Sequence, residues 1–405
     1  LELYDTPGLE DAIALLDHLE RLDRPGERLD GPARLARFLE GSEARQRYEQ
    51  EAKVLRQLLA SDAGLYVIDV REPVLAKYRD ELAVLAMCGR PLLPVLNFVA
   101  SGEHRTADWR EALARLGLHA LVAFDSVAPP EDGERRLYES LALLLERSRP
   151  QLQRLIEDHQ AQRRARHHAG ARLVAELLLD CAACRRSVAA QPVLEQAAIA
   201  ALRETIRQRE QRCVEALLSL YAFRPSDAQA GELPLLDGRW GDDLFNPETL
   251  KQLGIKVGGG MAAGAATGVG VDLLVGGLTL GAAAALGAVI GGSAQTLRNY
   301  GERLKGKLKG QRELTVDDAV LRLLALRQQQ LLRALDARGH AAMEAITLSA
   351  PQETLWRQGK LPAPLNLARA HPEWSSLNPG ARLEEAERAE QVERLRSEIA
   401  VQPVG

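Results

Sequence analysis

The sequence predicts a parallel α/β domain followed by a mainly α-helical domain. Three short apolar runs, at 63–70, 91–97 and 119–125, alternate with segments of helical periodicity. A continuous apolar run between polar turns is typical of a strand that is buried on both faces of a parallel sheet. Strands that alternate with helices in this way predict repeated strand–helix–strand units. After Pro129 and Pro130 the strand pattern stops, and long amphipathic helices are expected instead.

The composition indicates helices packed by aliphatic side chains and gives no overall nucleic-acid signature. Aromatic residues make up 4% of the 405 residues, and the formal net charge is −4. The four cysteines are too few and too irregularly spaced for a secreted disulfide scaffold. No signal-peptide pattern opens the sequence, so we expect a protein of the reducing cytoplasm.

Four regions follow one another along the chain. The opening Leu1–Tyr4 alternates apolar and polar positions, which predicts a strand that ends in a loop. Because the sequence starts within this expected strand, we expect the complete protein to continue upstream of Leu1. Helices are expected over 31–60 and 381–399. The expected domains are part of an α/β domain over 1–130, a helical domain over 131–250, a glycine-rich apolar segment with basic flanks over 251–312, and a helix with a polar tail over 313–405.

The loop Asp5-Thr6-Pro7-Gly8 carries the first candidate site. An aspartate at a strand end is suited to the shell of a magnesium ion, and a glycine lets a backbone N–H approach a γ-phosphate. This spacing is what the third motif of a GTPase requires. An ordinary strand-end turn is the more common explanation of so short a pattern.

The surrounding segments favour the nucleotide-binding interpretation. The stretch Asp5–Asp11, followed by 61–73, closely resembles the Era/TrmE-like translation-factor-class GTPases. The run 91–97 falls where that family has the strand that ends in its guanine-reading N-K-x-D motif. The resemblance covers about residues 1–130, and it implies part of a P-loop GTPase domain with a parallel sheet that lacks its first segment.

The resemblance implies GTP and GDP as ligands, with GTP hydrolysis and a Mg²⁺ cofactor in the full-length protein. It gives Asp5 a water-mediated role toward the metal, Gly8 the sensing of the γ-phosphate, and Asn97 a place facing the base. A strand-end cap is the alternative role for Asp125 and its neighbour Ser126. The implied nucleotide-binding residues are Asp5, Thr6, Pro7, Gly8, Asn97, Asp125 and Ser126.

Four departures from the family pattern restrict these expectations. The phosphate-binding G-x-x-x-x-G-K-[ST] loop and the switch I threonine are both missing, so we expect the chain alone neither to bind nor to hydrolyse GTP. Ala100 stands where the family has the aspartate that pairs with guanine, which puts guanine specificity in doubt. Leu9 follows Gly8 where Ras-like enzymes have a water-orienting glutamine, so no residue is assigned as the catalytic base.

The segment 257–294 consists mostly of Gly, Ala, Val and Leu, with Asp272 as its only charged residue. Glycines at four-residue spacing suit close helix packing in membranes, whereas in water each helical glycine costs about 1 kcal/mol relative to alanine. The part from Leu273 to Ala294 approaches the ~20 residues that cross a hydrocarbon core. Both flanks are basic, which keeps both ends in the cytoplasm. We expect a membrane hairpin that turns near Gly268–Asp272. Its packing glycines are Gly260, Gly264, Gly268, Gly277, Gly281, Gly287 and Gly291.

Two weaker signals and one alternative complete the analysis. A tightly packed soluble hairpin is the alternative for 257–294. Cys181 and Cys184 have the spacing of a zinc or redox pair, but without a second such pair they read as two small apolar thiols on one helix face. The arginine-rich run 162–168 reads as a solvated helix face.

The function expected from the sequence is that of a bacterial, membrane-associated regulatory GTPase, in which a nucleotide switch controls a helical effector domain. The expected partners are GTP or GDP and a membrane or helical protein, and nucleic acid is not expected. The expected location is the cytoplasm, with peripheral or hairpin-inserted attachment to the inner membrane. The alternative is a non-enzymatic helical scaffold or membrane-interaction protein with a degenerate GTPase domain, and Ala100 is the residue that favours it.

Overall fold

The computed structural model of the chain consists of two compact units, which are described separately. The first unit comprises residues 1–161 and the second begins at Gln162. The helix α7 (Arg149–Ala183) starts in the first unit and continues in the second. The structure describes residues 1–23, 27–100, 104–125, 132–223, 240, 243–246, 271–274, 311–338, 356–357 and 360–400.

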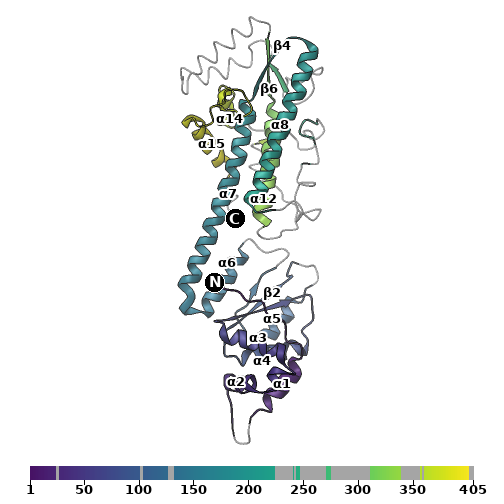
Figure 1. Cartoon of the computed structure of the whole chain (residues 1–405), viewed down its shortest axis with the longest axis vertical. Coiled ribbons are helices and arrows are strands. Elements are labelled where there is room, and N and C mark those ends of the chain that lie inside the picture. The colour runs from purple at the N-terminus through teal and green to yellow at the C-terminus, as the bar shows by residue number, and fades with distance from the viewer. Residues whose placement is uncertain are drawn as a thin grey trace. The chain divides into compact units, whose positions relative to one another are not determined.

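The first unit alternates helices and parallel strands (Figure 1). Asp11 and Asp30 begin its first two α-helices by accepting backbone N–H groups with their carboxylates, as N-cap residues do. The elements are α1 (Ala12–Glu20), α2 (Gly31–Glu40), η1 (Glu43–Arg45), α3 (Glu49–Ala60), β1 (Gly64–Asp69), α4 (Ala76–Ala86), β2 (Leu92–Asn97), α5 (Thr106–Arg115), β3 (Val122–Ala123), α6 (Gly133–Leu144) and η2 (Glu146–Ser148).

The sheet of the first unit has the order β1-β2-β3, and both strand pairs are parallel. The central strand β2 is buried on both faces: Leu93 and Val95 pack toward α6, whereas Leu96 packs with Trp109 of α5. This arrangement confirms the predicted parallel sheet with helices between its strands. Val67 of β1 pairs with Val95 of β2, and the two side chains are on the same face of the sheet. At β2 this face is covered by α6, whereas at β1 the Val67 side chain is 63% exposed.

The expected strand at Leu1–Tyr4 is wrong. Residues 1–9 belong to no helix or strand, and the side chains of Leu1, Leu3 and Tyr4 are 72%, 72% and 61% exposed. Alternation of apolar and polar residues stabilises a strand only when a neighbouring strand accepts its backbone hydrogen bonds. No described residue of the chain supplies such a neighbour to this segment.

The second unit is built around three long helices and a small antiparallel sheet (Figure 1). The strand order is β4-β6-β5, so β6 pairs with both other strands. Only Asp317 separates β6 from α12, and its carboxylate caps that helix by accepting the N–H of Ala319 at 2.6 Å. Besides α7, the elements are β4 (Arg185–Ala189), α8 (Pro192–Leu220), β5 (Val271–Leu274), β6 (Gln311–Val316), α12 (Asp318–Arg338), α14 (Ala363–Ala368), η5 (Pro372–Trp374) and α15 (Ala386–Ile399).

The core of the second unit joins α7, α8 and α12 to the C-terminal segment. Leu178, Leu217 and Leu324 are fully buried between the long helices, and Trp374 is buried with them. Gly170 allows a close approach at this point, because a Cβ atom there would lie 2.5 Å from Leu332 Cδ1. The expected long helices of this region and the charged C-terminal helix are therefore confirmed, whereas the small sheet was not expected.

Most of the glycine-rich segment lies outside the described residues, including all seven glycines of the expected hairpin. Its described part, Val271–Leu274, is a strand paired with β6. The span expected from Leu273 therefore begins with extended backbone that belongs to a sheet, not as a helix. Among the described residues, no helix combines the length and apolar character that crossing a membrane requires.

Candidate functional site

The three parallel strands of the first unit end at one edge of the sheet, where each is followed or closed by a polar residue. Asp69 closes β1, Asn97 closes β2, and Asp125 comes two residues after β3. The register pairs Asp69 with Asn97 and Leu96 with Ala123, so the three polar residues lie on neighbouring strands. Ligands of open parallel sheets bind at this carboxyl edge. This edge is therefore the candidate functional site.

The loop after β2 is held in one conformation by side-chain hydrogen bonds. Asn97 Oδ1 accepts the N–H of Phe98 at 2.9 Å, and Asp125 Oδ2 accepts the N–H of Ala100 at 2.9 Å. Phe98 has φ = 61°, in the left-handed region that costs a side-chain-bearing residue of order 1 kcal/mol. Asp125 is 2% exposed. Its contact is that of the strand-end cap weighed for it in the sequence, and it fixes the loop that carries Asn97.

Arg71 adds a feature that the sequence analysis missed. Its guanidinium pairs with Asp69, with 2.6 Å between Nη2 and Oδ2, and lies 3.8 Å from the centroid of the Phe98 ring. The hydrogen bond to Arg71 holds the pKa of Asp69 below its ordinary value. The Arg71 side chain is 51% exposed, so this edge presents a planar cation stacked on an aromatic ring. The sequence signal was an arginine two residues after an apolar strand.

The segment Asp5-Thr6-Pro7-Gly8 is exposed and belongs to no helix or strand. A Cβ atom at Gly8 would meet no heavy atom within 4 Å, so open space adjoins its Cα atom. The hydrogen bonds given above join Asn97 to Phe98 and Asp125 to Ala100. Ser126 lies outside the described residues.

The donor set fits magnesium only in the water-mediated role expected for Asp5. The described residues contain no group of three or more His, Cys, Asp or Glu side chains that could hold a metal ion by themselves. Magnesium keeps several waters and is often held by one or two carboxylates together with substrate phosphates. A single exposed carboxylate at Asp5 is compatible with that mode of binding.

The two cysteines of the C-x-x-C spacing are buried, and the described residues place no metal-binding group around them. Burial raises the pKa of the Cys184 thiol to about 11 and that of Cys181 well above its ordinary value. Protonated thiols are poor nucleophiles and poor metal ligands. Cys184 lies one residue beyond the end of α7, so the pair is not on one helix face, although both thiols are apolar core groups as expected.

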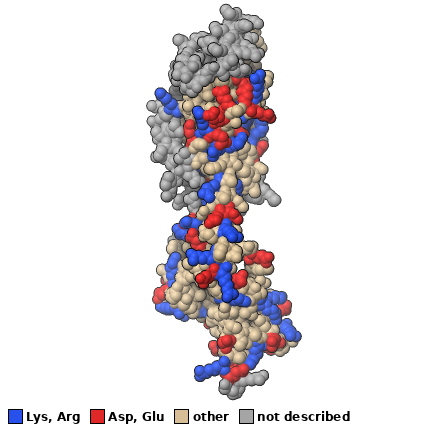
Figure 2. All heavy atoms as spheres, turned by 90° about the vertical axis from the view of Figure 1, so that its left-hand side faces the viewer, with Lys and Arg blue, Asp and Glu red and all other residues tan. Residues whose placement is uncertain are grey.

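Charged side chains of both signs are interspersed on the surface seen in Figure 2. Neither sign forms a continuous patch over the described residues of that face. This face therefore lacks the basic stripe by which proteins follow a nucleic-acid backbone.

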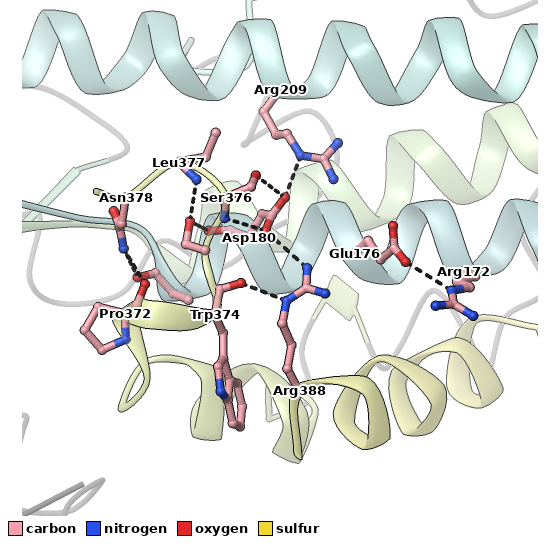
Figure 3. A network of polar contacts seen from close by, with 12 residues as sticks. Arg172, Glu176, Asp180, Arg209, Pro372, Trp374, Ser376, Leu377, Asn378 and Arg388 are labelled. Atoms are coloured by element: carbon pink, nitrogen blue, oxygen red, sulfur yellow. Dashed lines mark hydrogen bonds and ion pairs between the residues drawn. The ribbon is translucent and has the colours of Figure 1, made fainter. Parts of the chain in front are cut away.

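A buried polar network of the second unit surrounds Asp180 of α7 (Figure 3). The carboxylate accepts the Nε–H of Arg209 at 2.7 Å, the backbone N–H of Ser376 at 3.0 Å and the hydroxyl of Ser376 at 2.8 Å. Arg388 of α15 adds an N–H contact at 3.4 Å, and Ser375 donates to the Asp180 carbonyl. Every contact joins this carboxylate to the protein itself, so the network serves to attach the C-terminal segment to α7 and α8.

Comparison with known proteins identifies a family but no function. The family described as "Domain of unknown function (DUF3482)" matches residues 110–397, from α5 to α15 and thus well over half of the chain. No curated protein and no solved structure shows a significant match. The match includes the three long helices, the antiparallel sheet and the Asp180 network of the second unit. The chain belongs to the DUF3482 family.

Proposed function

We propose that this chain is part of a regulatory GTPase of the Era/TrmE-like kind, whose nucleotide switch controls the helical second unit. The observation that carries the proposal is the position of Asn97, at the carboxyl end of the central strand β2. A side chain placed there, on a loop fixed by Asp125, is positioned to face a bound base. The family resemblance of 1–130 assigns it that role.

The proposed roles follow the resemblance residue by residue. Asp5 would hold a water of the Mg²⁺ shell, and the backbone amide of Gly8, which has open space beside its Cα atom, would sense the terminal phosphate. Magnesium bound with GTP supplies neutralisation of the phosphate charge during hydrolysis. Asn97 orients the base. Thr6 and Pro7 lie between Asp5 and Gly8 in the exposed switch segment, where the ring of Pro7 restricts the backbone.

We also propose that the glycine-rich part of the chain attaches the protein to the cytoplasmic face of the inner membrane. The β5–β6 ladder places Leu274 opposite Glu313, so the chain leaves and returns to the sheet at adjacent positions. The sequence between them contains the apolar stretch 275–294 and the basic stretch 298–309. An apolar segment that leaves and re-enters one sheet at adjacent positions would have both its ends on one side of a membrane.

The test of membrane attachment keeps β5 intact, because that strand belongs to the sheet. Flotation with vesicles that contain anionic lipid should recover the full chain with the lipid, and a variant lacking 275–294 should remain at the bottom. The double variant Lys305→Gln with Lys307→Gln removes two positive charges and keeps the apolar stretch. If attraction to anionic headgroups contributes, recovery of this variant should be lower than that of the full chain and should depend less on salt. Equal recovery of the full chain and the deletion variant would exclude the membrane role.

The second candidate function is a helical scaffold without nucleotide chemistry. Ala100 stands at the base-reading position and has no carboxylate. The buried carboxylate of Asp125 accepts a hydrogen bond from the backbone N–H of Ala100. These two observations favour a first unit that has kept the fold of a nucleotide-binding domain while losing its ligand.

Nucleotide binding by the product of the complete gene separates the two candidates. We expect a fluorescent GDP analogue to bind that protein with Mg²⁺ and Asn97→Ala to weaken binding at least tenfold. Glu111→Gln, which alters only an exposed pair with Arg115 on α5, should leave binding unchanged. The 405-residue chain alone should show no binding. Absence of binding by the complete product, under conditions in which it is folded, would leave the scaffold function.

A further inference from the structure

His167 of α7 lies at the meeting point of all the long helices of the second unit and is independent of the proposed nucleotide site. Its Nδ1 is 2.5 Å from Oδ2 of Asp336 on α12, and its Nε2 is 3.3 Å from the carbonyl oxygen of Ala400, the C-cap of α15. Tyr221, directly after α8, donates its hydroxyl to the other oxygen of Asp336. Only 11% of the His167 side chain is exposed.

The number of protons in this cluster follows from its partners. The Ala400 carbonyl can only accept, so Nε2 must carry a hydrogen to bond it. The contact between Nδ1 and Asp336 also needs a proton, whether that proton resides on the ring or on the carboxylate. A neutral imidazole beside an ionised carboxylate has one N–H and can satisfy only one of the two contacts. The observed geometry therefore corresponds to the protonated form of the histidine–aspartate pair.

Several charged groups on the surrounding helices act on this pair. The hydrogen bond to Asp336 is the main reason that the pKa of His167 is raised; burial and the positive charge of Arg333 oppose the shift. Burial and Asp336 raise the pKa of Tyr221 far above its ordinary value, so its hydroxyl stays a donor, although Arg163 and Arg166 of α7 act in the opposite direction.

The neighbours on α7 and α15 have their own interactions. His168 is the next residue on α7, with its ring centroid 6.3 Å from that of His167, and takes part in neither of the two hydrogen bonds. In the last turn of α15, Arg396 pairs with Glu393 at 2.7 Å, and burial raises the pKa of Glu398.

We propose that His167 is a pH-dependent latch that holds the end of α15 to α7 and α12. In the protonated pair, Nε2–H bonds the Ala400 carbonyl and closes the latch. Loss of the proton leaves a single N–H, which the stronger charge-assisted bond to Asp336 retains, and a nitrogen lone pair then faces the carbonyl oxygen. The last turn of α15 is released, while its buried residues Val392 and Leu395 keep the rest of the helix in place.

The direction of the pH effect follows from the raised value in the folded chain. The latch contributes fully below the ordinary histidine pKa of 6.5 and is lost as the pH rises through the higher folded-state value. Alkaline conditions therefore open the latch.

Hydrogen exchange at the Ala400 amide, which bonds the Arg396 carbonyl at 2.8 Å, reports on the last turn of α15. In the full chain, its protection factor should fall about fivefold as the latch opens, as expected for one lost hydrogen bond. His167→Gln should be less protected at low pH and show no such step. His168→Gln is the matched control and should behave as the unaltered chain. An identical step in His167→Gln would overturn the proposal.

A second measurement does not depend on the folding of a histidine variant. At pH 6 the ¹⁵N resonances of the His167 ring should show a hydrogen on Nε2, and Tyr221→Phe should raise the midpoint of their titration. Removal of the hydroxyl donor leaves Asp336 more basic, so the pair keeps its proton to higher pH. A neutral ring at pH 6 whose hydrogen is on Nδ1 and not on Nε2, or a midpoint that falls in Tyr221→Phe, would contradict the latch.

Discussion

Asp180 of α7 and Arg209 of α8 form a buried ion pair, with 2.7 Å between the carboxylate Oδ2 and Nε. The Asp180 side chain is 3% exposed, and Arg388 of α15 approaches its second oxygen from the other side. The pair therefore connects two long helices with a C-terminal element more than two hundred positions away in the sequence.

The first prediction concerns this pair. Asp180→Ala should lower the free energy of unfolding by roughly 3–5 kcal/mol, because it leaves two buried guanidinium groups without their shared carboxylate. Urea denaturation followed by tryptophan fluorescence measures the change, since Trp374 lies in the attached segment. Glu176→Gln is the control: it removes an exposed pair with Arg172 one turn earlier on the same helix (Figure 3) and should cost less than about 1 kcal/mol. Equal losses in the two variants would show that the Asp180 pair contributes no more than a surface pair.

Glu210 of α8 should make stability depend on pH near neutrality. Burial raises the pKa of its carboxyl group to about 7 and outweighs the opposing attraction of Arg327, whose Nη1 lies 3.7 Å away. Between its ordinary value of 4.5 and about 7, the folded chain keeps a proton that the unfolded chain has lost. This contribution to stability is therefore lost as the pH rises through that window.

The measurement for Glu210 is the difference between the chain and Glu210→Gln, which cannot titrate. From about pH 5 to about pH 8, the unaltered chain should lose on the order of 1–3 kcal/mol relative to the variant. Comparison of the two proteins removes the effect of all other titrating groups. A difference that stays constant over this range would contradict the assignment.

Gly170 should resist a substitution that normally stabilises a helix. Alanine is favoured over glycine inside helices by about 1 kcal/mol, but here its Cβ would lie 2.5 Å from Leu332 Cδ1. We expect Gly170→Ala to destabilise the chain by about 1–3 kcal/mol. Thermal denaturation of Gly170→Ala, Leu332→Ala and the double variant tests the cause. The double variant should be more stable than the sum of the single effects, and strict additivity would rule out the steric explanation.

Phe98 allows a test of backbone strain at the candidate site. Its φ of 61° favours glycine over any residue with a Cβ atom. Phe98→Gly should therefore be more stable than Phe98→Ala by about 1 kcal/mol, although glycine is elsewhere the less stable of the two. Both variants lose the ring and its contact with Arg71, so the comparison isolates the backbone. Chemical denaturation of the two variants gives the difference directly, and a more stable alanine variant would be the opposite result.

The central part of the sheet was predictable because its signal is local. The apolar run 91–97 became β2, and the polar residues at strand ends had to share an edge once the strands were parallel. The antiparallel sheet was not predictable in this way. Its strand β4, Arg185–Ala189, has a polar sequence and pairs with β6, more than a hundred residues away. Nothing in the local pattern of β4 indicates that partner.

The candidate site also combines features that the local sequence predicts with features that it does not. The positions of Asn97 and Asp125 followed from strand order alone. The stack of Arg71 on Phe98 depends on a single left-handed residue in a loop, and hydrophobic periodicity contains no information about that conformation. The expected strand at Leu1–Tyr4 failed for a related reason, because a strand is defined by its neighbour and not by its own alternation.

The short passage from β6 to α12 has a mechanical consequence. The strand β6 is hydrogen-bonded to a neighbouring strand on each side. The one residue between β6 and α12, Asp317, caps the helix through its side chain. A pulling force applied at Gln311 would therefore load the hydrogen bonds of both strand pairs at once. It would be transmitted to α12 directly, because no flexible linker separates the strand from the helix. The strand and the helix would move together as one rigid segment.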